Sequence, residues 1–128
     1  MLSIDVKPFD GLLATKEQGV KVLEEASEFR EAFDSLAKAY QQYESEEHTT
    51  EEEREWAEII GQLIRNFVFE GCDALQAVVN LFMSVFNDEE AVGNYIKEGM
   101  AAITAKNAER GWYKEEETEE ENDGGAEA

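Results

Sequence analysis

The sequence predicts an all-α fold, an antiparallel four-helix bundle followed by a disordered acidic C-terminal tail. Three observations favour this class. The 128 residues contain a single proline, and long stretches are rich in alanine, glutamate, leucine, lysine and glutamine, which are good helix formers. Apolar residues recur at intervals of three and four, the period of one face of a helix. The connections between these stretches are short, which makes antiparallel neighbours the simplest packing.

The first predicted helix follows an irregular N-terminal segment. Residues 1–15 mix apolar residues with proline and glycine and show no clear period. Helical spacing then extends over about 16–43. Thr15 is a candidate N-cap, and Gln18 three residues later would complete a capping box. The apolar positions of this helix are Val20, Leu23, Ala26, Phe29, Phe33, Leu36, Ala37 and Tyr40.

An acidic connection separates the first helix from the second. Residues 44–53 contain no large apolar side chain, which predicts a solvated segment, and Thr49 or Thr50 would cap the helix that follows. Gly61 and Gly71 each weaken that helix by roughly 1 kcal/mol relative to alanine. We expect a bend or a close helix crossing near either glycine, or a break between two helical pieces at Gly71. The apolar stripe is Trp56, Ile59, Ile60, Leu63, Ile64, Phe67 and Val68.

Two further helices and a tail complete the predicted organisation. The third helix ends near Phe86, and the fourth covers about 89–108 before Gly111 closes it. The tail is strongly acidic and has no apolar residue larger than alanine, which predicts disorder. The predicted organisation is an irregular lead-in (1–15), a helical domain (16–113) and an acidic tail (114–128).

Charge and cysteine content exclude several classes of protein. Thirty-one acidic residues against eleven basic ones give a formal net charge of −20 at pH 7. This charge argues against binding of nucleic acid by any general surface of the molecule. The single Cys72 cannot form an internal disulfide, and no N-terminal segment combines a basic region with an apolar run. We therefore expect a cytoplasmic protein that neither spans a membrane nor is secreted.

Two acids interrupt the apolar run at 69–82. Glu70 and Asp73 are three residues apart and project from one face of a helix. Burying a carboxylate is costly unless a cation or a donor compensates it. Glu25 and Glu28 have the same spacing beside the apolar stripe of the first helix. Two facing helices could bring the four carboxylates together, and such a set of oxygens suits a hard divalent ion such as Mg²⁺.

The acidic pairs also have an ordinary explanation. In an acidic protein, glutamates at helical spacing usually form a solvated face, and this alternative applies most to Glu25 and Glu28. Glu24 could replace Glu25 as the inward residue, because Glu24 lies one turn from Glu28. Charged residues within an apolar run are seldom found unless they are paired, so the pair on the later helix is the stronger indication of a site.

The residues that carry a family resemblance occur in a fixed order along the chain. They are Glu25-x-x-Glu28, then Glu70-x-x-Asp73 followed by Ala74-Leu75, and finally Lys106-Asn107-x-x-Arg110-Gly111. The pattern resembles the MazG-like, all-α nucleoside triphosphate pyrophosphohydrolases, a superfamily that includes dimeric dUTPases and phosphoribosyl-ATP pyrophosphohydrolases. The resemblance covers roughly 16–113. The long separation between the two acidic pairs is similar to that of the enlarged members and leaves the base and sugar of the substrate open.

The resemblance implies a bundle of that superfamily's type with a metal-dependent activity. Glu25, Glu28, Glu70 and Asp73 would hold Mg²⁺, with Mn²⁺ as the alternative, on the triphosphate of a nucleoside triphosphate. A water activated by the metal and a carboxylate would release pyrophosphate and leave the (d)NMP. The resemblance also implies a homodimer or homotetramer whose subunits complete one another's pockets.

The remaining candidate residues would bind the substrate. Asn80 lies two turns after Asp73 on the same face and could hydrogen-bond the sugar or base, or bond a neighbouring helix as a core residue. Lys106, Asn107 and Arg110 share one edge of the last helix and could bind phosphates, with arginine binding two oxygens at once. Cations near a helix C-terminus also complement the helix dipole, which is the structural alternative.

Two functions of a different class compete with the enzyme. An acidic helical protein can imitate the phosphate backbone and occupy a DNA-binding partner, and the charge of −20 fits that role. A helical interaction module that merely retains the fold is the other alternative. The DNA mimic does not explain why acids lie inside an apolar run, and the interaction module would require that the carboxylates cannot converge.

Overall fold

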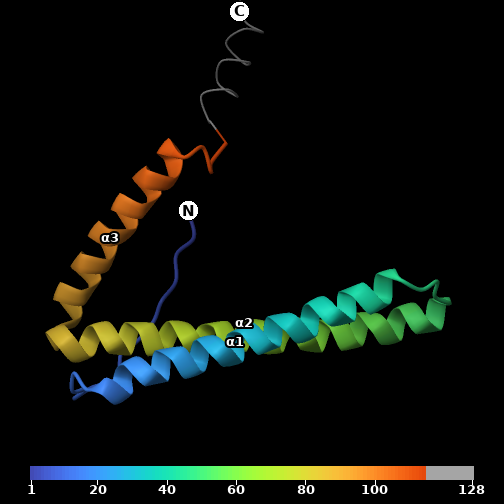
Figure 1. Ribbon diagram of the computed structural model, residues 1–128, viewed down its shortest axis with the longest axis horizontal. Helices are drawn as coiled ribbons and strands as arrows, with labels where there is room; N and C mark the ends of the chain where they lie inside the picture. The colour runs from blue at the N-terminus through green and yellow to red at the C-terminus, as the bar shows by residue number, and fades with distance from the viewer. Residues whose placement is uncertain (115–128) are drawn as a thin grey trace, which may run out of the picture. The chain divides into compact units, whose positions relative to one another are not determined.

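The computed structural model describes residues 1–114. The regular secondary structure in that range consists of α-helices (Figure 1). This confirms the predicted fold class. The predicted tail lies, beyond its first residue, outside the described range. The helices are α1 (Lys16–Glu44), α2 (Thr50–Phe86) and α3 (Glu89–Glu109).

Helices α1 and α2 run side by side as a long antiparallel hairpin (Figure 1). Aromatic residues hold the two helices together near the middle. The rings of Phe29 and Phe67 stack with centroids 5.0 Å apart, and Phe33 lies 6.0 Å from the same Phe67 ring. Stacked and tilted aromatic pairs of this kind stabilise a contact by about 0.5–1.5 kcal/mol beyond their buried area.

The prediction of four helices is wrong for the described residues, because the second and third predicted helices form one continuous α2. A lone glycine costs a helix only about 1 kcal/mol and keeps its backbone N–H, so Gly71 does not break the helix. The expected close crossing at Gly71 is confirmed. A Cβ atom added at Gly71 would lie 2.9 Å from Cε1 of Phe29, whereas at Gly61 it would meet only the Arg65 guanidinium at 3.8 Å.

The helix ends follow local chemistry. At the start of α2, Thr49 Oγ1 accepts a hydrogen bond from Glu52 N–H, and Glu52 Oε1 accepts one from Thr49 N–H, both at 3.2 Å. This capping box confirms Thr49 as the cap. The box expected at Thr15 does not form, although α1 begins where predicted. Instead, the backbone N–H of Gln18 donates to the Thr15 carbonyl oxygen at 3.2 Å.

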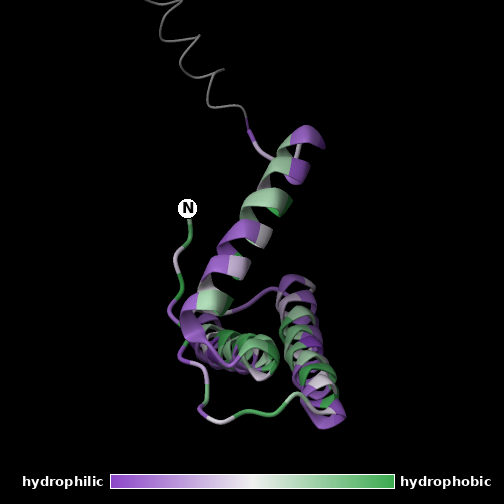
Figure 2. Cartoon of the chain, turned by 90° about the vertical axis from the view of Figure 1, so that its left-hand side faces the viewer, coloured by the Kyte–Doolittle hydropathy of each residue, from purple (hydrophilic) through white to green (hydrophobic). Residues whose placement is uncertain are grey.

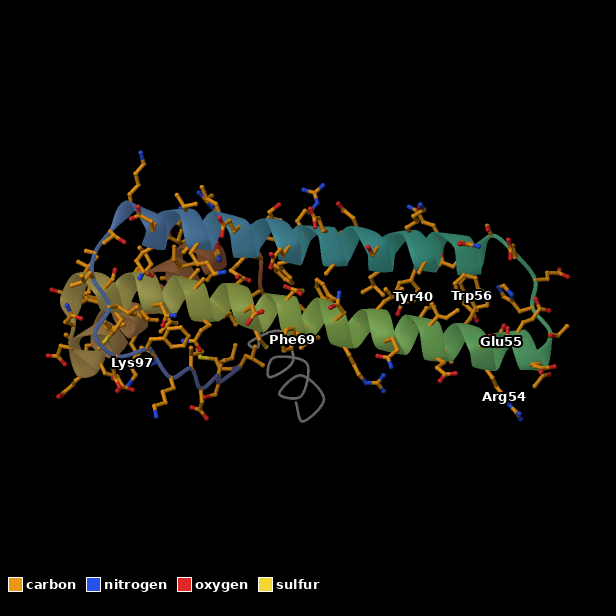
Figure 3. All side chains as sticks on the ribbon, turned by 90° about the horizontal axis from the view of Figure 1, so that it is seen from below. Tyr40, Arg54, Glu55, Trp56, Phe69 and Lys97 are labelled. Atoms are coloured by element: carbon orange, nitrogen blue, oxygen red, sulfur yellow. The ribbon has the colours of Figure 1, made fainter. Side chains whose placement is uncertain are left out.

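The connection between α1 and α2 is more ordered than the predicted solvated segment. The rings of Tyr43 and His48 stack with centroids 4.9 Å apart, and His48 Nε2 lies 2.8 Å from the Tyr43 carbonyl oxygen. The Tyr43 hydroxyl donates to Glu53 at 2.6 Å. Trp56 packs on this pair from α2, and Figure 3 shows it pointing toward α1 while Arg54 points away. His48 therefore has a packing role.

The hairpin has a thin core. Its buried apolar residues are Ala32, Leu36 and Ala77, and many large apolar side chains remain exposed, including Leu23 at 72% and Phe69 at 63%. Figure 2 shows apolar residues along both hairpin helices. A helix buries only one stripe against one neighbour, so two helices leave apolar surface uncovered. The chain from Glu90 onward, which holds most of α3, is a second compact unit and is described by itself.

Candidate metal centre

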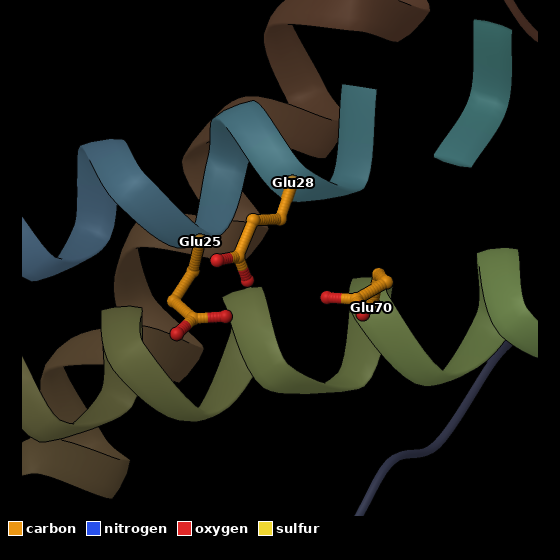
Figure 4. Close-up of side chains that lie close together, drawn as sticks. All are labelled: Glu25, Glu28 and Glu70. Carbon is orange, nitrogen blue, oxygen red and sulfur yellow. The ribbon is translucent and has the colours of Figure 1, made fainter. Parts of the chain in front are cut away.

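Three of the four predicted carboxylates converge between α1 and α2 (Figure 4). Glu25 and Glu28 extend from α1, and Glu70 extends from α2. One carboxylate oxygen from each residue lies within 4.8 Å of the others. Residues three apart share a helix face, and the aromatic contact between the helices sets the register that brings Glu70 opposite that face.

The carboxylates are buried to different degrees. Glu25 is 7% exposed, Glu70 is half-buried and Glu28 is exposed. Lys21 Nζ pairs with Oε1 of Glu25 at 2.7 Å. Oε2 of Glu25 and Oε2 of Glu70 are buried, and neither has a hydrogen-bond partner among the described residues. A buried charged oxygen without a partner is costly, so these two atoms are where a cation would stabilise the protein most.

The acids of the cluster repel one another. The negative charge of Glu25 raises the pKa of the Glu28 carboxyl above its ordinary value, and lost hydration and the charge of Glu70 raise it further. The ion pair with Glu25 raises the pKa of the Lys21 ammonium. A divalent cation among the three carboxylates would reverse the sign of this interaction, because a nearby positive charge favours the ionised acid. The donor set, three carboxylates, is what Mg²⁺ and Mn²⁺ prefer.

The structure distinguishes among the other predicted acids. Asp73 is exposed and is not one of the three acids whose oxygens converge. It lines a pocket that Glu25 also lines, next to the cluster. Of the two residues considered for the inward position of α1, Glu25 is buried and Glu24 is exposed. The candidate metal site of the described residues therefore consists of Glu25, Glu28 and Glu70, and Asp73 lines the pocket beside it.

The pocket beside the cluster has a volume of about 440 Å³ and lies within the first unit of the chain. Asn80, a predicted substrate-binding residue, is 7% exposed and lines this pocket. The lining residues come from the N-terminal segment, the start of α1 and the second half of α2. They are Phe9, Leu12, Glu17, Gln18, Lys21, Glu25, Asp73, Gln76, Ala77 and Asn80.

The three predicted phosphate-binding residues lie at the end of α3. Lys106 and Asn107 belong to its last turn, and the backbone N–H of Arg110 donates to the Lys106 carbonyl oxygen at 3.2 Å. Gly111 follows with a positive φ of 78°, as the predicted helix end requires. All of these residues belong to the second unit, and phosphate binding by them stays a prediction.

The sequence analysis missed Lys21, Phe9 and Leu12 as residues of the site. Lys21 could have been found, because its spacing of four residues before Glu25 is that of a helical ion pair. Phe9 and Leu12 lie in a segment without periodicity, so no pattern assigned them to a surface.

Comparisons of the chain with protein-family models, with curated proteins and with solved structures found no match. The features that characterise this protein are therefore its own geometry. Within residues 1–114, an all-α hairpin gathers three carboxylates beside a pocket, and two of these carboxylates have a buried oxygen without a partner in that range. A function has to be inferred from these features together with the family resemblance of the sequence.

Proposed function

We propose that this protein is a Mg²⁺-dependent nucleoside triphosphate pyrophosphohydrolase, which converts a (d)NTP to the (d)NMP and pyrophosphate. The observation that carries the proposal is the convergence of Glu25, Glu28 and Glu70, in which one buried oxygen of Glu25 and one of Glu70 have no hydrogen-bond partner among residues 1–114. Mg²⁺ has six ligand positions and usually retains waters and substrate phosphates in a protein site. Three carboxylates on one side leave the other positions to the triphosphate and water.

The residues have separate roles in this proposal. Glu25, Glu28 and Glu70 would hold the metal, which when bound would neutralise phosphate oxygens and lower the pKa of a water. Asp73 lies in the adjoining pocket, where its carboxylate can accept a proton from the attacking water or ligate a second ion. Lys106, Asn107 and Arg110 remain the proposed phosphate-binding residues, and Asn80 remains the proposed residue for the nucleoside.

We further infer that the four-helix bundle forms between two copies of the chain. The hairpin has exposed apolar residues along α2, among them Val68, Phe69 and Val85. Apolar surface of this extent marks an interaction face, and closed two-fold symmetry is the usual way to cover it. Two hairpins packed together would supply the four helices, as a homodimer or as half of a homotetramer.

A membrane is a weaker explanation for the same surface. By length and composition, α2 contains a stretch apolar enough to cross a bilayer. However, α2 also carries Glu70 and Asp73, and a charged residue at the centre of a spanning helix costs about 2.5–3.5 kcal/mol. A second copy covers the apolar residues without placing these carboxylates in lipid, which agrees with the proposed cytoplasmic location.

The competing proposal is an acidic protein that mimics DNA. The net charge of −20 favours this role. A surface that imitates phosphates needs its charges in solvent, whereas Glu25 is 7% exposed and shares its site with two other acids. The burial of Glu25 within a cluster of acids favours the enzyme.

The test of the proposed function is pyrophosphate release from a panel of common and modified (d)NTPs with Mg²⁺ or Mn²⁺. We expect Glu25→Gln to lower the rate about a hundredfold or more, because it removes the charge of a metal ligand and keeps its shape. Glu31→Gln makes the same charge change on the exposed face of α1 and should leave the rate unchanged. Equal rates in the two variants would contradict the assignment of the site.

A further inference from the structure

The N-terminal segment before α1 is tied to α2 by side-chain hydrogen bonds. The backbone N–H of Phe9 donates to Oδ1 of Asn80 at 3.1 Å, across 71 positions of sequence. Nε2 of Gln76 donates to the Lys7 carbonyl oxygen at 2.8 Å and to Oδ1 of Asn80 at 3.0 Å. A segment without regular structure is therefore held in place beside the metal centre.

These hydrogen bonds fix the orientation of two side-chain amides. A backbone N–H can only donate and a backbone carbonyl can only accept, so Oδ1 of Asn80 must face Phe9 and the NH₂ group of Gln76 must face Lys7. Rotating either amide by 180° would place two donors or two acceptors together. Because Oδ1 already accepts two hydrogen bonds, the group with which Asn80 could bind a ligand in the pocket it lines is its Nδ2 donor.

The N-terminal segment also forms one wall of the pocket. Phe9 and Leu12 contribute apolar side chains, and Glu25 belongs both to this pocket and to the carboxylate cluster. Pockets that bind small molecules are about 300–1,000 Å³ in volume, mostly apolar, with a few placed polar groups that fix orientation. The pocket of about 440 Å³ falls within this range, and its lining combines apolar side chains such as Phe9 and Leu12 with charged ones such as Glu25 and Lys21.

We propose that the N-terminal segment over 7–12 is a specificity-determining wall that binds the nucleoside part of the substrate. Phe9 packs against the base, and Nδ2 of Asn80, held by the segment, donates a hydrogen bond to the base or sugar. The phosphates extend from there toward Glu25. This proposal rests on the proposed function, and it adds the residues that recognise the organic part of the ligand.

Two probes separate this wall from the metal centre. The non-hydrolysable α,β-imido analogues of the four common dNTPs carry a nucleoside, whereas inorganic tripolyphosphate carries only the phosphates. Calorimetry with Mg²⁺ measures the affinity of the full-length protein for each. We expect Phe9→Ala to weaken binding of the best analogue about tenfold, the scale of one lost base–aromatic contact, and to leave tripolyphosphate binding unchanged.

A second variant tests the hydrogen bonds. Gln76→Leu removes the donor that ties Lys7 and Asn80 together, so it should cause the same selective loss without altering Phe9. Leu13→Ala is the control, because Leu13 directly follows the proposed wall, is 71% exposed and is not among the residues that line the pocket.

The outcomes distinguish this inference from the proposed function. Selective loss of analogue binding in both Phe9→Ala and Gln76→Leu is the expected result. Unchanged analogue binding, or equal loss of analogue and tripolyphosphate, overturns the inference while leaving the enzyme proposal in place. If the unaltered protein binds neither probe in the presence of Mg²⁺, the proposed function fails and this inference fails with it.

Discussion

At the scale of residues, the carboxylates of the candidate metal site lie near one another and differ in how far they are buried. The spacing of Glu25 with Glu28, and the position of Glu70 in an apolar run, were enough to predict that they would meet. Burial separates Glu25 from Glu24, and Asp73 is not among the acids whose oxygens converge. Spacing assigns a residue to a helix face to within about one position, and only the packing of the second helix determines which oxygen is enclosed.

Glu28 gives a prediction about pH. Its raised pKa means that the folded, metal-free protein favours the protonated acid. The associated stability is fully present below the pKa of the unfolded chain and is lost as the pH rises through the raised pKa. In EDTA, Glu28→Gln should therefore be more stable than the unaltered protein near pH 7, and the difference should shrink as the pH falls toward about 4.

Thermal melts of both proteins across this pH range measure the difference. The difference between the two proteins cancels the pH dependence that other groups contribute to the stability of both. Glu52 is one such group, because its capping hydrogen bond to Thr49 lowers its pKa. Glu31→Gln controls for the change in net charge. A difference in melting temperature that stays constant with pH would show that the other acids do not raise the pKa of Glu28.

At the scale of elements, the sequence predicted what local chemistry decides and failed where a distant residue decides. The beginning of α1, the Thr49 cap and the end of α2 near Phe86 depend on residues within one turn, and they were predicted. At Gly71 the sequence left a close crossing and a break both open; α2 continues through this glycine, and Phe29, the residue it packs against, is far away in sequence. The N-terminal segment was not placed for the same reason.

The two glycines of α2 should respond oppositely to alanine. Gly71→Ala places a methyl group against the Phe29 ring, which stacks on Phe67, and overpacking of this kind costs about 1–3 kcal/mol. The gain in helix propensity, about 1 kcal/mol, offsets part of this cost. At Gly61 there is room, so Gly61→Ala should gain about 1 kcal/mol. Urea denaturation measures both, and a stabilising Gly71→Ala would contradict the close crossing.

At the scale of the whole molecule, the hairpin is an incomplete core. The sequence predicted enough apolar stripe for four helices, whereas in the first unit the described helices that pack together are α1 and α2, with the N-terminal segment beside them. Periodicity shows that a face will be covered, but not whether the same chain or another copy covers it. This is why the helical class was predictable and the bundle was not.

Self-association is the prediction at this scale. Equilibrium sedimentation should find a dimer or a tetramer. Phe69→Lys should weaken it, because it places a charge on a side chain that is 63% exposed on α2. Gln41→Lys serves as the control, because it makes the same charge change at an exposed residue of α1. Only monomer at high protein concentration would contradict the inferred bundle.

The central claim is that the three carboxylates form a metal site and are not merely a charged surface. The most direct test is the melting temperature with and without Mg²⁺ or Mn²⁺, because a ligand that binds only the folded state at a hundred times its Kd stabilises it by about 2.7 kcal/mol. We predict that either ion raises the melting temperature of the unaltered protein and of Glu58→Gln. Glu58 is an exposed acid of α2, the helix that carries Glu70. Glu70→Gln should melt higher than the unaltered protein in EDTA, since one repelling carboxylate is gone, and should not respond to the metal. An unaltered protein whose melting temperature ignores both ions, or a Glu70→Gln variant that responds as fully as Glu58→Gln, would contradict the site.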